Sequence, residues 1–364
     1  MRRSIRLQNG STRSYPGTSV PWWATAATAG AVLLLVTSAL TTAAPAGSPS
    51  RAPPVVPTSH SWSQVSTGST HPPGLVGPSM AYDPTDGYVV LFGGMAGGSG
   101  NRTNETWTYH AGVWTQLHPR VAPSPRAYAA MAWDGKDGYL LLEGGVGCGV
   151  WAINCNDTWS FVGGNWTSRG AGPPTRYYWA TMAYNAAIGK TVLFTGAYGP
   201  SETYEWSSLG WVTFGHTTAA TLGAWGDADL AYDPGLRTLV LASGFNLSCP
   251  GGTYPTYCLH TWSYSRTGWT ALANKTTAGP IAFGMAWDPS NHRMVEYPKA
   301  PCCNNVSPPY TLQLIGTHWI NVSGFSPGAR YGPGVTYDGG DGYLLMFGGS
   351  LMATQFPTTT WELL

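Results

Sequence analysis

The sequence predicts an all-β fold, a six-bladed β-propeller closed by a strand from the N-terminal side of the repeats. The 364 residues include 48 glycines and 18 tryptophans but only 10% charged residues, a composition that suits short strands joined by tight turns. A unit of about 50 residues recurs six times. The sixth copy is incomplete, and the part that it lacks precedes the first copy.

Each unit contains a turn followed by an apolar strand, which predicts the two inner strands of a blade. The six turns begin at Asp83, Asp134, Asn185, Asp233, Asp288 and Asp338. In units one, two and six the apolar strand ends in two glycines, which permit positive φ angles and close approach of neighbouring chains. We therefore expect strand a to run into the turn and strand b to end at the glycines.

Two aromatic positions, seven residues apart, follow in most units and predict the outer strands c and d. The pairs are Trp107 and Trp114, Trp159 and Trp166, Tyr204 and Trp211, and Trp262 and Trp269; unit five has Leu312 and Trp319. Polar and apolar residues alternate around them, as in half-buried strands. We expect their rings to fill the wedge between adjacent blades, because a four-stranded sheet cannot cover both its faces alone.

The sixth unit stops shortly after Trp361, where a turn and a second tryptophan should follow. Residues 60–65 resemble residues 112–117 of the first unit, and they precede that unit at the spacing of a strand d. We therefore expect residues 60–65 to supply the outer strand of the sixth blade, with Trp62 beside Trp361. One propeller domain would then span residues 60–364.

These motifs together resemble the kelch repeat. The shared features are the turn with Gly-Tyr, Phe-Gly-Gly, Asn-x-Thr-Trp, and a leader in which proline shortly precedes Arg126, Arg176 or Arg330. The resemblance covers about residues 60–364 and implies four-stranded blades in a ring of six or seven. Most kelch propellers bind partners, but the fold does not imply one function.

The N-terminal 44 residues read as a signal peptide or a signal anchor. Four arginines without an acid precede an uncharged apolar stretch, Trp22–Ala44, which is long enough to span a bilayer and also ends in small residues like a cleavage site. Both outcomes remain open. A linker rich in proline and serine follows at 45–59, and the arginines place the rest of the chain outside the membrane, secreted or anchored at the cell surface.

Cysteines and glycosylation signals also favour export. All six cysteines follow the apolar segment, and the simplest pairing is local: Cys148 with Cys155, Cys249 with Cys258, and Cys302 with Cys303, although six cysteines allow 15 pairings. A zinc site is disfavoured because CxxC spacing is lacking. Asn-x-Ser/Thr triplets begin at Asn101, Asn104, Asn156, Asn165, Asn246, Asn274, Asn305 and Asn321. They predict a glycosylated surface, although biased composition alone explains part of the excess.

A candidate binding rim lies where the inner strands begin. Arg126, Arg176 and Arg330 would stand near one mouth of the central channel, with Tyr128, Tyr178 and Tyr331 beside them. Such a rim could bind a carboxylate, a sugar acid or a peptide segment. The alternative is that each arginine holds the start of its blade through hydrogen bonds to loop carbonyls and acids.

The sequence predicts no catalytic, metal or cofactor site. The eight histidines scatter over linkers, turns and outer strands, which disfavours a copper centre of the galactose oxidase type. Glu143 replaces a strand-b phenylalanine, and we expect it to pair with a leader arginine of a neighbouring blade, because an unpaired buried acid is costly. A role in acid–base chemistry is its alternative. Glu296 is expected to point the other way.

These observations favour a non-enzymatic extracellular or cell-surface propeller that binds a protein or a glycan through its loop face. A net charge of +1 without a basic stripe disfavours a nucleic-acid partner. Trp151, Trp179 and Trp225 fall outside the repeat pattern and are candidate platforms for sugar stacking. The alternatives are an extracellular carbohydrate-active enzyme on a propeller scaffold and a structural component of the cell envelope.

Overall fold

The computed structural model divides the chain into two units, Met1–Pro54 and Val55–Leu364. It describes residues 61–97, 99–148, 154–173, 179–195, 202–214, 228–243, 260–273, 281–299, 311–322, 327–328, 330–351 and 355–364. Within these ranges there is no helix with the length and hydropathy that a membrane crossing requires. The predicted signal segment at 1–44 and the linker at 45–59 lie outside the described residues.

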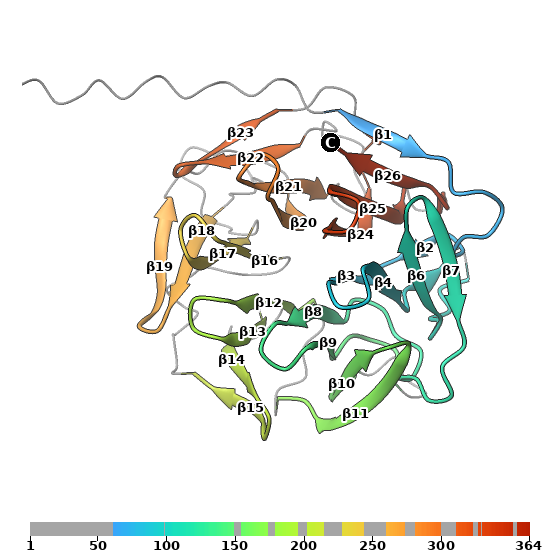
Figure 1. Cartoon of the computed structure of the whole chain (residues 1–364), viewed down its shortest axis with the longest axis horizontal. Coiled ribbons are helices and arrows are strands. Elements are labelled where there is room, and N and C mark those ends of the chain that lie inside the picture. The colour runs from blue at the N-terminus through green and yellow to red at the C-terminus, as the bar shows by residue number, and fades with distance from the viewer. Residues whose placement is uncertain are drawn as a thin grey trace, which may run out of the picture. The chain divides into compact units, whose positions relative to one another are not determined.

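Six four-stranded antiparallel sheets form a β-propeller, as the repeat predicts (Figure 1). Blade one consists of β3 (Ser79–Asp83), β4 (Tyr88–Phe92), β6 (Thr106–His110) and β7 (Val113–Leu117). Blade two consists of β8 (Ala130–Asp134), β9 (Tyr139–Glu143), β10 (Asp157–Val162) and β11 (Asn165–Ala171). Blade three consists of β12 (Thr181–Asn185), β13 (Lys190–Thr195), β14 (Glu202–Ser207) and β15 (Gly210–Thr213).

The second half of the ring repeats this plan. Blade four consists of β16 (Ala228–Asp233), β17 (Thr238–Ser243), β18 (His260–Ser265) and β19 (Gly268–Ala273). Blade five consists of β20 (Ile281–Asp288), β21 (Arg293–Lys299), β22 (Leu312–Ile315) and β23 (His318–Asn321). Blade six consists of β24 (Tyr331–Asp338), β25 (Tyr343–Ser350), β26 (Thr360–Leu363) and β1 (Trp62–Val65). In every blade the first strand lies next to the central channel and the fourth lies at the rim (Figure 1).

The ring is closed by the strand that the sequence predicted. β1 pairs antiparallel with β26, with Trp62 opposite Leu363 and Val65 opposite Thr360. Trp62 and Trp361 belong to one buried cluster that also contains Tyr297 of blade five. Both ends of the described domain therefore contribute to the same blade.

A short two-stranded ribbon was not predicted, because it falls outside the repeat. It pairs β2 (Leu75–Val76) with β5 (Met95–Ala96). Leu75 is fully buried and packs in the cluster that contains Leu345 and Phe347 of blade six and Leu91 of blade one. The ribbon therefore covers the seam between the sixth blade and the first.

The Asp or Asn that begins each turn has a structural role. Oδ1 of Asp83 accepts the backbone N–H groups of Thr85 and Asp86, which fixes the tight turn that an Asp side chain favours. The same pattern recurs at Asp134, Asp288 and Asp338, and with one bond each at Asn185 and Asp233. The turn motif thus needs no catalytic explanation.

A hydrogen bond from tryptophan to threonine joins every pair of neighbouring blades. The indole N–H of the strand-d tryptophan donates to the hydroxyl of the threonine at, or just before, the start of strand c in the preceding blade, at 2.8 to 3.0 Å. The six pairs are Trp114 and Thr360, Trp166 and Thr106, Trp211 and Thr158, Trp269 and Thr203, Trp319 and Thr261, and Trp62 and Thr311. We call this bond the blade tie.

Candidate functional site

The inner strands enclose a cavity of about 440 Å³ along the central channel. At the end formed by the a–b turns, one aromatic residue from each blade contributes to the lining, directly before the turn. These residues are Tyr82, Trp133, Tyr184, Tyr232, Trp287 and Tyr337, and all are half-buried. We call this end the turn mouth, and the opposite end, beside the d–a and b–c loops, the loop mouth.

Three aromatic residues meet at the loop mouth. The ring of Tyr128 stands edge-on to that of Trp179, with centroids 5.7 Å apart, and to that of Tyr331, with centroids 6.4 Å apart. The three residues come from blades two, three and six, and each is half-buried. The structure therefore brings together Tyr128 and Tyr331, which were predicted for the binding rim, with Trp179, which was predicted as an exposed platform.

Two of these aromatic residues have an unusual backbone conformation. Tyr128 has a φ of 57° and Trp179 a φ of 64°, whereas the equivalent positions of blades one and six are Gly77 and Gly332, at 65° and 61°. All four stand six residues before the turn residue of their blade. Glycine adopts this conformation freely, but other residues in it carry strain of about 1 to 3 kcal/mol. Two large aromatic side chains thus occupy positions where glycine would carry less backbone strain.

The two glycines make room for the ring of Tyr128. A Cβ atom on Gly77 would lie 2.5 Å from Cδ1 of Tyr128, and one on Gly332 would lie 3.3 Å from its Cε1. Backbone bonds link the same positions: the N–H of Tyr128 donates to the carbonyl of Gly77, and the N–H of Gly77 donates to that of Gly332, both at 2.8 Å. The backbone therefore holds the Tyr128 ring across the start of three blades.

Asp229 of blade four is the only Asp, Glu, Lys, Arg or His among the described residues that line the cavity. Its Oδ2 accepts the backbone N–H of Gly284 in blade five. Behind the wall lies Glu296, which is fully buried and stands opposite the cavity-lining Met285 in the register of β20 and β21. Burial, and then the charge of Asp229, raise the pKa of Glu296 well above its usual range.

Glu296 and Glu143 lie on opposite faces of their blades, as predicted. Met285, opposite Glu296, packs towards blade four, which precedes its own blade. Glu143, by contrast, lies beside Trp211 of blade three, which follows its own blade. Neither glutamate belongs to the cavity lining.

Arg126 is almost completely buried, with 1% of its surface exposed. Its guanidinium donates to both carboxylate oxygens of Asp157, at 2.7 and 3.0 Å, and to the carbonyls of Gly144 and Ser124. Burial alone would raise the pKa of Asp157, but the hydrogen bonds and charge of Arg126 hold it below its usual range. These contacts fasten the start of blade two to its own strands.

Arg330 has the corresponding place in blade six, with 2% of its surface exposed. It donates to the carbonyl of Gly348 at 2.6 Å and to the hydroxyl of Thr359 at 3.1 Å, and its guanidinium lies 5.8 Å from the ring centroid of Trp361. Arg126 and Arg330 therefore match the structural interpretation of the leader arginines better than the binding one. Arg176 and Tyr178 lie outside the described residues.

Glu143 does not form the ion pair that the sequence predicted. Arg126 belongs to the same blade and pairs with Asp157, which is the one ion pair of the described ranges. Glu143 instead accepts the hydroxyl of Thr158 at 2.5 Å. Burial raises its pKa to about 8, and the hydrogen bond from Thr158 only partly opposes this shift. The expectation of an ion pair with a neighbouring blade is thus not met, and the carboxyl is held in a buried, hydrogen-bonded position.

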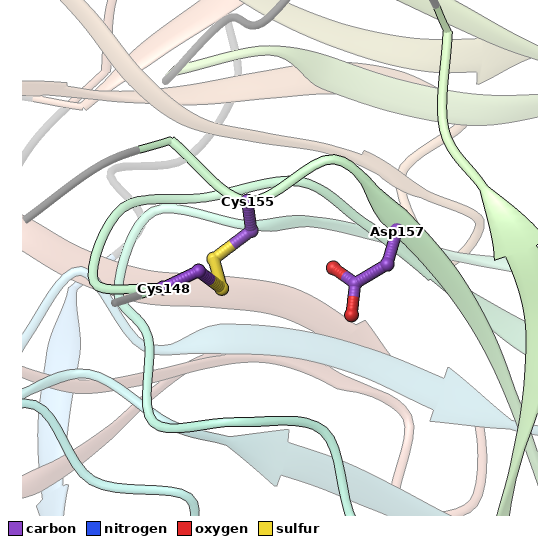
Figure 2. A group of neighbouring side chains, drawn as sticks. All are labelled: Cys148, Cys155 and Asp157. Carbon is purple, nitrogen blue, oxygen red and sulfur yellow. A yellow bond between two sulfur atoms is a disulfide. The ribbon is translucent and has the colours of Figure 1, made fainter. Parts of the chain in front are cut away.

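The local disulfide in blade two is confirmed. Cys148 and Cys155 are bonded, with Cα atoms 5.1 Å apart, and the carboxylate of Asp157 lies beside them (Figure 2). The three groups lie close enough to hold a metal ion, but the sulfurs are bonded to each other and Asp157 is paired with Arg126. The four other cysteines, at 249, 258, 302 and 303, lie outside the described residues.

The described glycosylation signals differ in accessibility. Asn101, Asn104, Asn165 and Asn321 are exposed, whereas Asn156 is half-buried. The threonines of the signals at Asn104 and Asn156 are Thr106 and Thr158, and both accept blade ties. The signals at Asn246, Asn274 and Asn305 lie outside the described residues, as do Trp151 and Trp225.

Sequence reasoning missed Asp229 and the left-handed positions at the loop mouth. Asp229 could have been recognised from the repeat, because it is the charged residue at a position where the other blades have uncharged ones. The equivalent residues are Ser79, Ala130, Thr181, Gly284 and Gly334. Comparison with known proteins adds no assignment: neither a protein-family model nor a curated protein matches the chain.

Proposed function

We propose that the chain is a non-enzymatic binding propeller of the kelch type. Its ligand, a glycan or a flexible segment of a partner protein, enters the channel at the loop mouth and contacts Tyr128, Trp179 and Tyr331. We further propose that the domain acts outside the cell, secreted or anchored through residues 1–44. The repeat motifs support the kelch assignment, and the arginine-led apolar segment supports export.

The strained aromatic residues carry the proposal. Strained backbone is concentrated at functional sites, where surrounding structure compensates for its cost. At the loop mouth the strained residues are the two whose rings pack edge to face, Tyr128 and Trp179, while the equivalent glycines show that the fold does not require a side chain there. Function is therefore the better explanation for Tyr128 and Trp179 than blade packing.

The size and chemistry of the channel suit a small or slender ligand. A cavity of about 440 Å³ falls in the range typical of small-molecule sites. Tyrosine and tryptophan offer flat apolar faces together with polar edges, which suit sugar rings and extended peptides alike. A large folded partner would contact only the surface around the mouth.

The distribution of ionisable groups favours binding over hydrolysis. Acid–base catalysis needs two titratable groups that converge on one reacting atom. Of the acidic and basic residues in the described part of the lining, Asp229 stands alone. Glu143, the acid considered from the sequence, does not contribute to that lining.

The disulfide between Cys148 and Cys155 supports an extracytoplasmic location, because such bonds persist mainly in oxidising compartments. Both cysteines belong to the b–c loop of blade two, which lies on the same side of the ring as Tyr128. Export of the chain can be measured directly by separating culture medium, membrane and cytoplasmic fractions. Recovery of the chain only from the cytoplasm would contradict this part of the proposal.

The binding site is tested with the full-length protein on a glycan array and a peptide array. We expect Tyr128→Gly and Trp179→Gly to weaken binding by at least about tenfold, since each removes a ring where glycine fits the backbone. Ala111→Gly is the matched control, because Ala111 also has a positive φ, of 47°, but lies in the c–d turn of blade one. Unchanged binding in both ring variants would refute the loop mouth as the site.

A further inference from the structure

We propose that the protein has a second ligand site, between blades two and three, which binds a small zwitterion with one ammonium and one carboxylate group, as in an amino acid. A pocket of about 370 Å³ lies there, on the face of the a–b and c–d turns. Asp137, Tyr139 and Arg169 line it from blade two, and Trp206 and residues 208–210 line it from blade three. We call it the seam pocket. It is separate from the channel, so the inference goes beyond the proposed function.

The acid of the seam pocket recurs in three blades. Asp86, Asp137 and Asp341 each stand three residues after the Asp that begins the turn, and each accepts the hydroxyl of the tyrosine two residues further on, at 2.7 to 3.0 Å. Asp86 also accepts the backbone N–H of Gly163 in the c–d turn of the next blade, at 3.2 Å. Asp341 likewise accepts that of Ala111, at 2.7 Å. Asp137 accepts no N–H from blade three.

The conformation of the c–d turn explains the missing bond. In blades one and two both central residues of this turn have positive φ angles, of 47° and 81° and of 55° and 79°, as in type I′ hairpin turns. In blade three Ser208 takes the place of Ala111 and Gly163, and the positive φ, of 113°, falls on Gly210 instead. A different turn therefore leaves Asp137 without its amide.

The other charge of the seam pocket stands where the remaining blades have an apolar residue. Three residues after the strand-d tryptophan they have Val65, Leu117, Phe214, Leu272 and Val322. Two of these side chains approach the c–d turn of the next blade. A Cβ atom on Gly164 would lie 4.0 Å from Cδ1 of Leu117, and one on Gly112 would lie 3.9 Å from Cγ1 of Val65. In blade two Arg169 has this place, so the seam with blade three carries a charge.

Contacts within the blades hold both charged groups in position. Nε of Arg169 donates to Oγ of Ser160 at 2.8 Å, and the guanidinium carbon lies 4.6 Å from the ring centroid of Tyr139. The hydroxyl of Tyr139 donates to Oδ2 of Asp137 at 2.9 Å and accepts the indole N–H of Trp206 at 3.1 Å. The Tyr139 ring thus carries the guanidinium on its face and the carboxylate at its hydroxyl end.

The two charges flank the same tyrosine without pairing with each other. Burial raises the pKa of Tyr139, and the charge of Asp137 adds to this shift while that of Arg169 opposes it. The described ranges contain one ion pair, in which neither residue takes part. Oδ1 of Asp137 and the two terminal nitrogens of Arg169 have no hydrogen-bond partner within those ranges. These atoms remain for a ligand.

A zwitterion suits this arrangement better than a simple ion does. A guanidinium binds a carboxylate through charge-assisted hydrogen bonds, and a carboxylate accepts an ammonium group in the same way. An anion at Arg169 would be repelled by Asp137, and a cation at Asp137 would be repelled by Arg169. A ligand with both charges satisfies both residues. The rings of Tyr139 and Trp206 supply apolar surface for its carbon atoms.

The test compares a zwitterion with two molecules that each keep one of its charges. The full-length protein is titrated calorimetrically at about pH 6.5, where α-amino groups are protonated. The probes are alanine, alaninamide, which has only the ammonium, and N-acetylalanine, which has only the carboxylate. We expect alanine to bind at least about tenfold more tightly than either. β-Alanine, whose charges are one carbon further apart, reports the spacing, and preference for either amino acid supports a zwitterion.

Two variants assign the charges to their residues. Arg169→Gln should reduce alanine binding to about the level of alaninamide, because the carboxylate loses its partner. Asp137→Asn should reduce it to about the level of N-acetylalanine, and the amide oxygen can still accept the hydroxyl of Tyr139. Asp86→Asn and Arg266→Gln remove the same charges from exposed positions outside the pocket. Both should leave alanine binding unchanged.

A third variant tests why the pocket is open. The triple variant Ser208→Gly, Leu209→Gly, Gly210→Asn gives blade three the turn sequence of blade two, residues 163–165. We expect the N–H at position 208 then to bond to Asp137, as the equivalent N–H groups do in two other blades, and alanine binding to be lost. An unfolding curve like that of the parent protein shows that the variant is folded.

The inference fails separately from the proposed function. Alaninamide or N-acetylalanine that binds as tightly as alanine would overturn the zwitterion. Alanine binding that persists unchanged in Arg169→Gln or in Asp137→Asn would overturn the site, as would binding of no probe at millimolar concentrations. None of these outcomes bears on the channel, which the glycan and peptide arrays test through Tyr128 and Trp179.

Discussion

The indole N–H of Trp62 donates a hydrogen bond of 2.9 Å to Oγ1 of Thr311, which lies 249 residues further along the chain. Trp62 belongs to blade six and Thr311 precedes strand c of blade five, so this bond is the blade tie between them. The tie from Trp114 to Thr360 joins blade six to blade one in the same way. The N-terminal strand is thus bonded as the other five outer strands are.

Replacement of Trp62 by alanine tests the closure of the ring. The side chain is 2% exposed and packs edge-on to Tyr297, so Trp62→Ala should lower the free energy of unfolding by about 3 to 5 kcal/mol. Leu209→Ala is the control, because Leu209 is 98% exposed. Denaturant unfolding measures both variants. Equal stability in the two would show that the closing strand is dispensable.

Variants of Thr106 and Asn104 separate the contribution of the blade tie to stability from that of a glycan on Asn104. Thr106→Val deprives the buried indole of Trp166 of its acceptor and should cost about 1 to 3 kcal/mol. Thr106→Ser keeps both the hydroxyl and the Asn104 signal, and Asn104→Gln removes only the signal. Thr115→Val, at an exposed position of β7, controls for the substitution itself.

Unfolding curves and glycan mapping distinguish the two roles of this threonine. If Asn104→Gln destabilises the protein as much as Thr106→Val does, the threonine acts through a glycan. If Thr106→Val alone destabilises it, the tie is the cause. A stable Thr106→Val variant would show that the tie adds nothing to stability.

The disulfide of blade two should stabilise the domain. It closes a short loop, with a sequence separation of 7, and loop-closure entropy predicts a contribution of about 2 kcal/mol. We expect the double variant Cys148→Ser, Cys155→Ser to unfold at lower denaturant concentration than the parent protein. Peptide mapping without reduction should recover the two cysteines in one linked pair. Free thiols at both positions would contradict the prediction.

Glu143 should make stability depend on pH between about 4.5 and 8. Its carboxyl has an ordinary pKa of 4.5, and burial raises the pKa in the folded protein to about 8. The folded state binds this proton more tightly than the unfolded state, so its contribution is fully present below the lower value and is lost as pH rises through the upper one. Glu143→Gln removes this dependence.

The comparison of wild type with Glu143→Gln isolates this group from other acids that titrate in the same range. Between pH 5 and pH 8 the wild type should lose up to about 4 kcal/mol more unfolding free energy than the variant. Denaturant titrations at several pH values measure the difference. Parallel curves for the two proteins would show that the carboxyl is not protonated in the folded state.

The blades could be predicted because their signals are local and recur. Each turn residue, Asp or Asn, is followed by its strand at nearly constant spacing. The match between residues 60–65 and 112–117 predicted the closing strand. The threonines of the blade ties were visible too, since Thr106, Thr158 and Thr360 directly precede a tryptophan. Their role was missed because a bond between blades depends on how two sheets pack, which spacing along one chain does not show.

The loop mouth was only partly predictable. Tyr128 and Tyr331 were identified from their place at the start of an inner strand, but so were Arg126 and Arg330, which the structure buries. Which of two residues near a strand start faces the channel depends on the local backbone twist. Tyr128 and Gly77 share a left-handed backbone conformation but are different residue types. No sequence pattern therefore indicated that conformation.

The closing pair of β1 and β26 also governs when the domain can finish folding. The two strands are almost 300 residues apart, and synthesis at 5 to 20 residues per second separates their appearance by roughly 15 to 60 s. Through that interval β1 has no strand to pair with, and unpaired strand edges invite association with other chains. A nascent chain that stops before residues 360–363 never completes the sixth blade. Only chains that include these residues can close the ring.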